Sequence, residues 1–78
     1  MIVKILGSGC AKCKSLEEKV RALDRTHELH LQIEKVTDLQ HIMSYGVIST
    51  PALVIDEKVR SVGKVPPDQQ LLQWFKEG

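Results

Sequence analysis

In the first half of the chain, segments with the apolar pattern of strands flank a stretch whose apolar residues recur at helical spacing. Residues 2–6, Ile-Val-Lys-Ile-Leu, are almost continuously apolar, which predicts a short interior strand covered on both faces. Beyond them, Cys, Leu, Val and Leu occupy positions 13, 16, 20 and 23, and this spacing predicts a helix that begins after Cys10 and ends near Asp24 or Arg25. Apolar residues at 29, 31 and 33 alternate with polar ones, which predicts a half-buried strand at the edge of a sheet.

A short second helix is expected next. Thr37 and Gln40 have the spacing of a capping box, in which Thr caps the helix and Gln reaches back to it. The helix should stop at Gly46, because glycine favours the left-handed conformation that ends helices. Its buried face should consist of Leu39, Ile42 and Met43.

The last third of the chain predicts a hairpin and a final helix. The apolar residues 52–55 and the stretch 58–62 should form two strands joined by a turn at Asp56-Glu57. After two consecutive prolines, the spacing of Leu71, Leu72 and Phe75 predicts the inner face of a helix from about Asp68 to Lys76.

The order of elements is therefore β-α-β-α-β-β-α in one domain that spans residues 1–78. The first two strands should be parallel and joined by a right-handed crossover, and the closing hairpin should add antiparallel strands. These expectations define an α/β fold with a four-stranded mixed sheet.

Composition narrows the classes of partner. Eleven Lys and Arg against ten Asp and Glu give a net charge of +1, so no strong field favours nucleic acid or an anionic membrane. No apolar stretch approaches the roughly 18 residues of a membrane span. The N-terminus runs directly into a strand without the pattern of a leader peptide. We therefore expect a cytoplasmic monomer that binds neither nucleic acid nor membrane.

The candidate chemistry is concentrated in the only two cysteines, Cys10 and Cys13. They lie where a strand ends and a helix begins, and the partial positive charge of a helix start lowers the pKa of a thiol there. Cys13 continues the apolar stripe of the helix and should face the core, whereas Cys10 lies at the helix mouth. The exposed sulfur should then attack a disulfide and the inner one should resolve it. Lys12 adds positive charge nearby.

A CxxC pair can also serve other purposes. A bridge across so short a loop contributes little stability, which argues against a structural disulfide, and inert buried thiols are a further alternative. The spacing of Cys10 and Cys13 from His27 and His30 is close to that of a zinc finger, but an intervening helix would hold the histidines roughly 15–20 Å away. The histidines, His41 included, are expected in solvent.

Soft-metal binding is the alternative function. Copper chaperones also place a CxxC before their first helix and bind Cu(I) through two thiolates. They normally carry Met two residues before the first cysteine, where this chain has Ser8, and they end on a strand rather than a helix. A bridged iron–sulfur or zinc dimer belongs to the same alternative.

Two motifs carry a resemblance to a known family. The start Gly7-Ser8-Gly9-Cys10-Ala11-Lys12-Cys13-Lys14 and the stretch Tyr45-Gly46-Val47-Ile48-Ser49-Thr50-Pro51-Ala52-Leu53 resemble the thioredoxin-like superfamily, in particular its small thioredoxin- and glutaredoxin-like proteins from archaea and bacteria. The resemblance implies a thioredoxin-like fold with helices on both faces of the sheet. It also implies a thiol–disulfide oxidoreductase without a cofactor, acting on disulfides of proteins or small molecules and reduced by a thioredoxin-reductase-like donor.

The resemblance also suggests residues around the cysteines. Pro51 should follow a cis peptide bond and face the cysteines, so that the Thr50 backbone can pair with a substrate chain. Gly9 stands where thioredoxins have Trp and should contact substrate, and Tyr45 could tune the site. Lys4 replaces the buried acid of thioredoxins, and the late Gly-Gly and Cys-Asp pattern with which glutaredoxins hold glutathione is absent.

Overall fold

The computed structural model of the protein describes residues 1–77. Its elements are β1 (Ile2–Leu6), α1 (Ala11–His27), β2 (Gln32–Val36), α2 (Leu39–Ser44), β3 (Ala52–Ile55), β4 (Lys58–Val62) and α3 (Asp68–Glu77). The strands form one mixed sheet in the order β2-β1-β3-β4. β1 runs parallel to β2 and antiparallel to β3, and β3 runs antiparallel to β4. The predicted element order and mixed sheet are confirmed.

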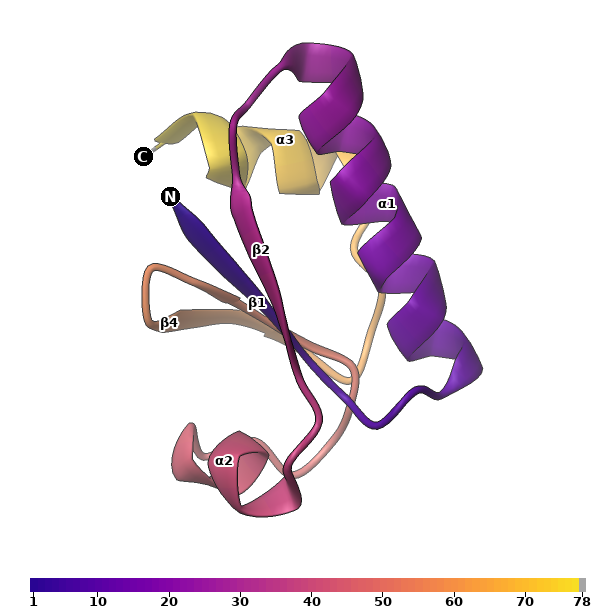
Figure 1. Cartoon of the computed structure of the whole chain (residues 1–78), viewed down its shortest axis with the longest axis vertical. Helices are drawn as coiled ribbons and strands as arrows, with labels where there is room; N and C mark the ends of the chain where they lie inside the picture. Colours follow the sequence, from indigo (N-terminus) through magenta and orange to yellow (C-terminus); the bar gives the residue numbers. More distant parts are fainter. Residues whose placement is uncertain (78) are drawn as a thin grey trace.

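Apolar side chains cover both faces of the sheet, as its inner strands predict. On one face α1 and α3 pack against alternate residues of β1 and β3, including Val3, Ile5 and Leu53. On the other face the intervening residues, among them Leu6 and Val54, pack with Ile42 of α2. Figure 1 shows α1 and α3 together and α2 apart from them, near one end of the sheet. Helices therefore lie on both faces, as expected.

The first crossover differs from the prediction at two points. α1 continues to His27 instead of ending near Asp24 or Arg25. Glu28 caps it in the left-handed conformation, and the Glu28 N–H donates to the Asp24 carbonyl. β2 begins at Gln32, not at residue 29, although it is an edge strand as predicted. His30 has a φ of 56°, and the Leu31 N–H donates to the Asp24 carboxylate, so this segment turns before it becomes extended.

The predicted buried face of α2 is only partly correct. Ile42 is buried at 3% exposure, but Leu39 is 68% exposed and Met43 58% exposed. A helix of only six residues turns a single side chain into the core, and its flanks at Leu39 and Met43 face solvent. The cap is also one residue later than predicted, because the Asp38 carboxylate, and not Thr37, accepts the His41 N–H.

The hairpin turn has the predicted position without the glycine that such turns prefer. Asp56 and Glu57 both have positive φ angles, 47° and 71°, which is the pattern of a primed two-residue turn. The Asp56 side chain accepts the Ile2 N–H at 2.8 Å, so the turn is also bonded to the start of β1. Within residues 1–77, no helix combines the length and apolar character needed to cross a membrane.

Candidate active site

The cysteine pair occupies the start of α1, where the chain leaves β1. Cys10 is the N-cap residue, and its sulfur accepts the Cys13 N–H at 3.2 Å. The two residues form a disulfide, with Cα atoms 5.0 Å apart. Cys10 is exposed, whereas Cys13 is only 5% exposed. The predicted difference in exposure between the two cysteines is confirmed.

Gly7 makes room for the inner sulfur. This residue is buried, and its N–H donates to the Val36 carbonyl of β2 at 2.9 Å. A Cβ atom at Gly7 would clash with Cys13 Sγ, would lie 3.2 Å from Cys13 Cβ, and would also lie 3.7 Å from Thr50 Cβ. Gly7 thus lies between Cys13 and Thr50 and allows the two residues to pack around it.

The Thr50–Pro51 peptide bond is cis, as the resemblance implied. Pro51 is fully buried and its carbonyl accepts the Gly63 N–H at 2.8 Å, while Thr50 is exposed. The loop before β3 is therefore held on the β4 side and open on the side of Thr50. Thr50 and Cys13 share Gly7 as a neighbour, so Thr50 lies near the cysteine pair.

Gly9 and Lys12 lie at the exposed edge of the pair. Gly9 has a φ of 93°, a left-handed conformation that favours glycine, and a Cβ there would meet nothing within 4 Å. The space beside Cys10 is thus open. Lys12 is exposed in the first turn of α1, which contains no acidic residue. The first turn of α1 therefore contributes positive charge and no negative charge beside Cys10.

Tyr45 lies in a different cluster. Its hydroxyl receives a hydrogen bond from Lys4 Nζ at 3.0 Å and donates to the Glu57 carboxylate at 3.2 Å. Lys4 Nζ also lies 2.7 Å from Glu57 Oε1. These bonds raise the pKa of Lys4 above its ordinary value, and the hydrogen bond from Lys4 lowers the pKa of Glu57. The structure thus brings Tyr45 together with Lys4 and the hairpin turn rather than with the cysteines.

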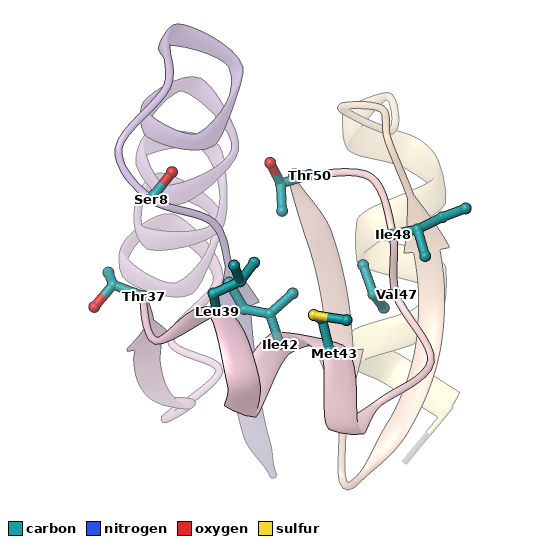
Figure 2. Close-up of a pocket in the computed structure, with 8 residues that line it drawn as sticks. All are labelled: Ser8, Thr37, Leu39, Ile42, Met43, Val47, Ile48 and Thr50. Atoms are coloured by element: carbon teal, nitrogen blue, oxygen red, sulfur yellow. The ribbon is translucent and has the colours of Figure 1, made fainter.

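A groove that the sequence did not predict opens next to Thr50. It has a volume of about 480 Å³, and we call it the α2 groove; it is lined by Ser8, Thr37, Leu39, Ile42, Met43, Val47, Ile48 and Thr50. Figure 2 shows side chains of α2 and of the loop before β3 around it. The available signal was the excess of apolar residues at 39–48 over what a six-residue helix can bury.

The histidines do not approach the cysteines as metal ligands. His27, His30 and His41 are exposed. In the part of the chain that the structure describes, no three His, Cys, Asp or Glu side chains are grouped so as to hold a metal ion. The arrangement at α1 instead offers two sulfurs that can exist as a disulfide or as two thiols.

Three features together define a dithiol–disulfide oxidoreductase of the thioredoxin-like fold. They are a mixed sheet with helices on both faces, a CxxC at the first helix and a cis-proline loop beside it. Residues 1–76 match the family model described as a thioredoxin domain. The chain belongs to the thioredoxin family, which implies disulfide-containing substrates and a reductase partner.

Two archaeal proteins named thioredoxin are similar over nearly the whole chain. The one from Methanothermobacter thermautotrophicus is 27% identical over 71 residues, which cover 91% of this chain and 92% of the relative. The one from Methanocaldococcus jannaschii is 29% identical over 76 residues, which cover 97% of this chain and 87% of the relative. The similarity extends well beyond the segment that contains the cysteines.

Proposed function

We propose that Cys10 is the nucleophile of this oxidoreductase and Cys13 its resolving cysteine. The Cys10 thiolate attacks one sulfur of a substrate disulfide, which forms a mixed disulfide and releases the other substrate thiolate. Cys13, once deprotonated, then attacks Cys10 Sγ. This step forms the Cys10–Cys13 disulfide and releases the second substrate thiolate. The substrate thus gains two electrons, and the enzyme loses two.

The difference in exposure between the two cysteines carries this assignment. An attacking sulfur must reach a substrate from solvent, and Cys10 is exposed where Cys13 is 5% exposed. The Cys10 sulfur also accepts a backbone N–H of the first helical turn, at 3.2 Å. Such N–H groups and the positive end of the helix favour a negatively charged sulfur, which is the nucleophilic form.

Two neighbours support substrate binding, and a third favours the thiolate. The open space at Gly9 admits a substrate chain to Cys10. The backbone of Thr50 would pair with an extended substrate segment as an added strand would, which its exposure before the cis Pro51 supports. Lys12 adds a positive charge that favours the thiolate. These roles are part of the proposal, whereas Tyr45 is left out of it, because its hydroxyl bonds to Lys4 and Glu57.

The reaction cycle needs a source of electrons. A reductase of the thioredoxin-reductase type would attack the Cys10–Cys13 disulfide and return the enzyme to the dithiol, which requires two electrons and two protons in all. The cytoplasm suits this cycle, because its reducing systems keep most thiols reduced. We propose that the protein acts there as a monomer on disulfides of proteins or small molecules.

Single replacements of the two cysteines test the assignment. Cys13→Ser should trap a mixed disulfide on Cys10 with a disulfide substrate, detectable by mass spectrometry, whereas Cys10→Ser should trap none. Equal trapping by both variants would contradict distinct roles. Purification under reducing conditions followed by metal analysis tests the soft-metal alternative: copper, zinc or iron bound stoichiometrically, and lost equally in both variants, would favour it over disulfide exchange.

A further inference from the structure

Three exposed lysines flank the cysteine pair. Lys12 and Lys14 lie in the first turn of α1, and Lys64 lies in the loop between β4 and α3. The salt bridges within residues 1–77 involve other cations, namely Lys4, Lys19, Arg21, Lys35 and Arg60. The three lysines near the cysteines thus carry ammonium groups that pair with no carboxylate of the described chain.

The loop between β4 and α3 is bonded to both sides of the cysteine site. Gly63, just before Lys64, donates its N–H to the Pro51 carbonyl at 2.8 Å. Two residues beyond Lys64, the Pro66 carbonyl accepts a hydrogen bond from Lys19 Nζ of α1 at 3.0 Å. Figure 1 shows this loop running alongside α1 on its way to α3. Lys64 therefore lies between the cis-proline and α1, the helix that carries the cysteines.

The carboxylates on the neighbouring elements are mostly engaged with other cations. Glu17 of α1 lies within 3.3 Å of cations on α1 and β2. Asp68 of α3 lies 3.3 Å from Lys19 Nζ. Glu18 follows Lys14 by one helical turn, but within residues 1–77 the two form no salt bridge. The α1 side of the cysteine pair therefore bears an excess of positive charge, although the net charge of the chain is only +1.

An excess of positive charge beside a nucleophilic sulfur selects among substrates. A thiolate is repelled by a disulfide that bears carboxylates, and ammonium groups nearby offset this repulsion. Such charges also steer the diffusional encounter of two molecules and so raise the rate of association. A small disulfide would approach one or two of the ammonium groups, whereas a polypeptide that crosses the site can face the lysines of α1 and of the loop together. Their distribution over two segments therefore favours an acidic polypeptide.

We propose that Lys12, Lys14 and Lys64 select protein partners that carry acidic residues around their disulfide. Lys14 and Lys64 act on the encounter with the partner, and Lys12 does so in addition to favouring the thiolate. The proposal rests on the proposed attack by Cys10 and adds a substrate class to it: polypeptide disulfides flanked by Asp or Glu.

Three matched peptides test the proposal. Each carries one cysteine in disulfide linkage with a neutral, chromophoric pyridine thiol, and the residues two positions before and after it are Asp, Asn or Lys. Attack on the peptide sulfur releases the chromophore, and division by the rate with dithiothreitol corrects for intrinsic reactivity. At low ionic strength we expect the Asp peptide to react about tenfold faster than the Lys peptide, with the Asn peptide between them. The ratio should approach one in roughly 1 M salt, where the Debye length is about 3 Å.

Variants then locate the preference. Lys14→Gln and Lys64→Gln should each lower the ratio of the Asp to the Lys peptide about twofold, as one charge about 10 Å from a carboxylate in water predicts. Lys58→Gln is the matched control, because Lys58 is an exposed lysine next to the hairpin turn. That turn is bonded to the start of β1, whereas the cysteines follow its end, so this variant should keep the wild-type ratio. The Asn peptide should react with every variant at close to the wild-type rate, which shows that Cys10 is intact.

Several results would overturn the proposal. These are equal corrected rates for the Asp and Lys peptides, or a ratio that Lys14→Gln and Lys64→Gln change no more than Lys58→Gln does. Dithiodiglycolate, a small disulfide with two carboxylates, is compared with the cationic cystamine by mass spectrometry. A preference for this dianion as large as that for the Asp peptide would show that the lysines serve small anionic disulfides instead. The proposed function itself fails differently: no peptide would release chromophore, or Cys10→Ser would release it as fast as wild type.

Discussion

The backbone of Gly7 lies directly against the sulfur of Cys13. A side chain at Gly7 has no room, because its Cβ would clash with Cys13 Sγ and approach Cys13 Cβ at 3.2 Å. The end of β1 can therefore pass beneath the first turn of α1, and the inner sulfur stays covered while the outer one remains exposed. The difference in exposure between the cysteines depends on this absent side chain.

Gly7→Ala should displace the inner sulfur. We expect a loss of about 1–3 kcal/mol in the free energy of unfolding, the usual cost of one extra methyl group in a packed site. Resolution should also slow, so that a mixed disulfide on Cys10 lives longer than in wild type. Denaturant unfolding and quenched-reaction mass spectrometry measure the two effects.

Gly9→Ala is the matched control for that change. Here a Cβ meets nothing within 4 Å, but the φ of 93° strains any residue with a side chain. We expect a loss of about 1 kcal/mol without a longer-lived mixed disulfide. A slower resolution in Gly9→Ala than in Gly7→Ala would contradict the steric explanation.

Adjacent residues of α2 should differ sharply in their effect on stability. Ile42→Ala should lower the free energy of unfolding by about 2–5 kcal/mol, because Ile42 is buried in the core between α2 and the sheet. Met43→Ala should change it by less than about 0.5 kcal/mol, since that side chain is mostly exposed. Urea unfolding of both variants checks the orientation of α2, and equal losses would refute it.

The Lys4–Tyr45–Glu57 cluster predicts a loss of stability in acid. The hydrogen bond from Lys4 lowers the pKa of Glu57 below its ordinary value of 4.5 in the folded protein. A lowered pKa means that the unfolded chain binds a proton more readily than the folded one. The stabilisation of the folded state by ionised Glu57 is therefore present above about pH 4.5, and it is lost as the pH falls through the lower pKa of the folded state.

Glu57→Gln should therefore flatten the decline of the melting temperature below pH 4.5, relative to wild type. The matched control is Glu18→Gln, at an exposed position of α1. Thermal melts at several pH values between neutrality and strong acid measure the difference. A decline as steep in Glu57→Gln as in wild type would show that the cluster does not couple to folding.

Much of this architecture follows from local sequence patterns. The apolar runs of β1 and β3 and the stripe that ends at Leu23 predict their elements, because burial on two faces or on one helix face imposes those spacings. The position of Cys13 on that stripe likewise predicts its burial. These features depend on the spacing of apolar residues within one segment and on the presence of a core. They depend little on which other segment packs against that one.

The errors lie where distant residues decide the structure. β2 starts after Leu31 because the Asp24 side chain binds the Leu31 N–H, a contact across the end of α1. Met43 fits a helical apolar stripe, yet it is exposed, because no element within residues 1–77 packs over it. Tyr45 lies near the cis-proline motif in sequence, but its hydroxyl bonds to Lys4 on β1. The hydrophobic pattern of a segment does not indicate which distant residue will contact it.

Competitive alkylation of the reduced protein is the most direct test of whether Cys10 is the nucleophile and Cys13 the resolving cysteine. Brief exposure to iodoacetamide over a range of pH, followed by peptide mapping, gives the rate at each cysteine. We predict that Cys10 reacts at least about tenfold faster than Cys13 and reaches half its maximal rate below pH 8.5, roughly the value for a free thiol. Equal rates, or faster modification of Cys13, would contradict the assignment of Cys10 as the nucleophile.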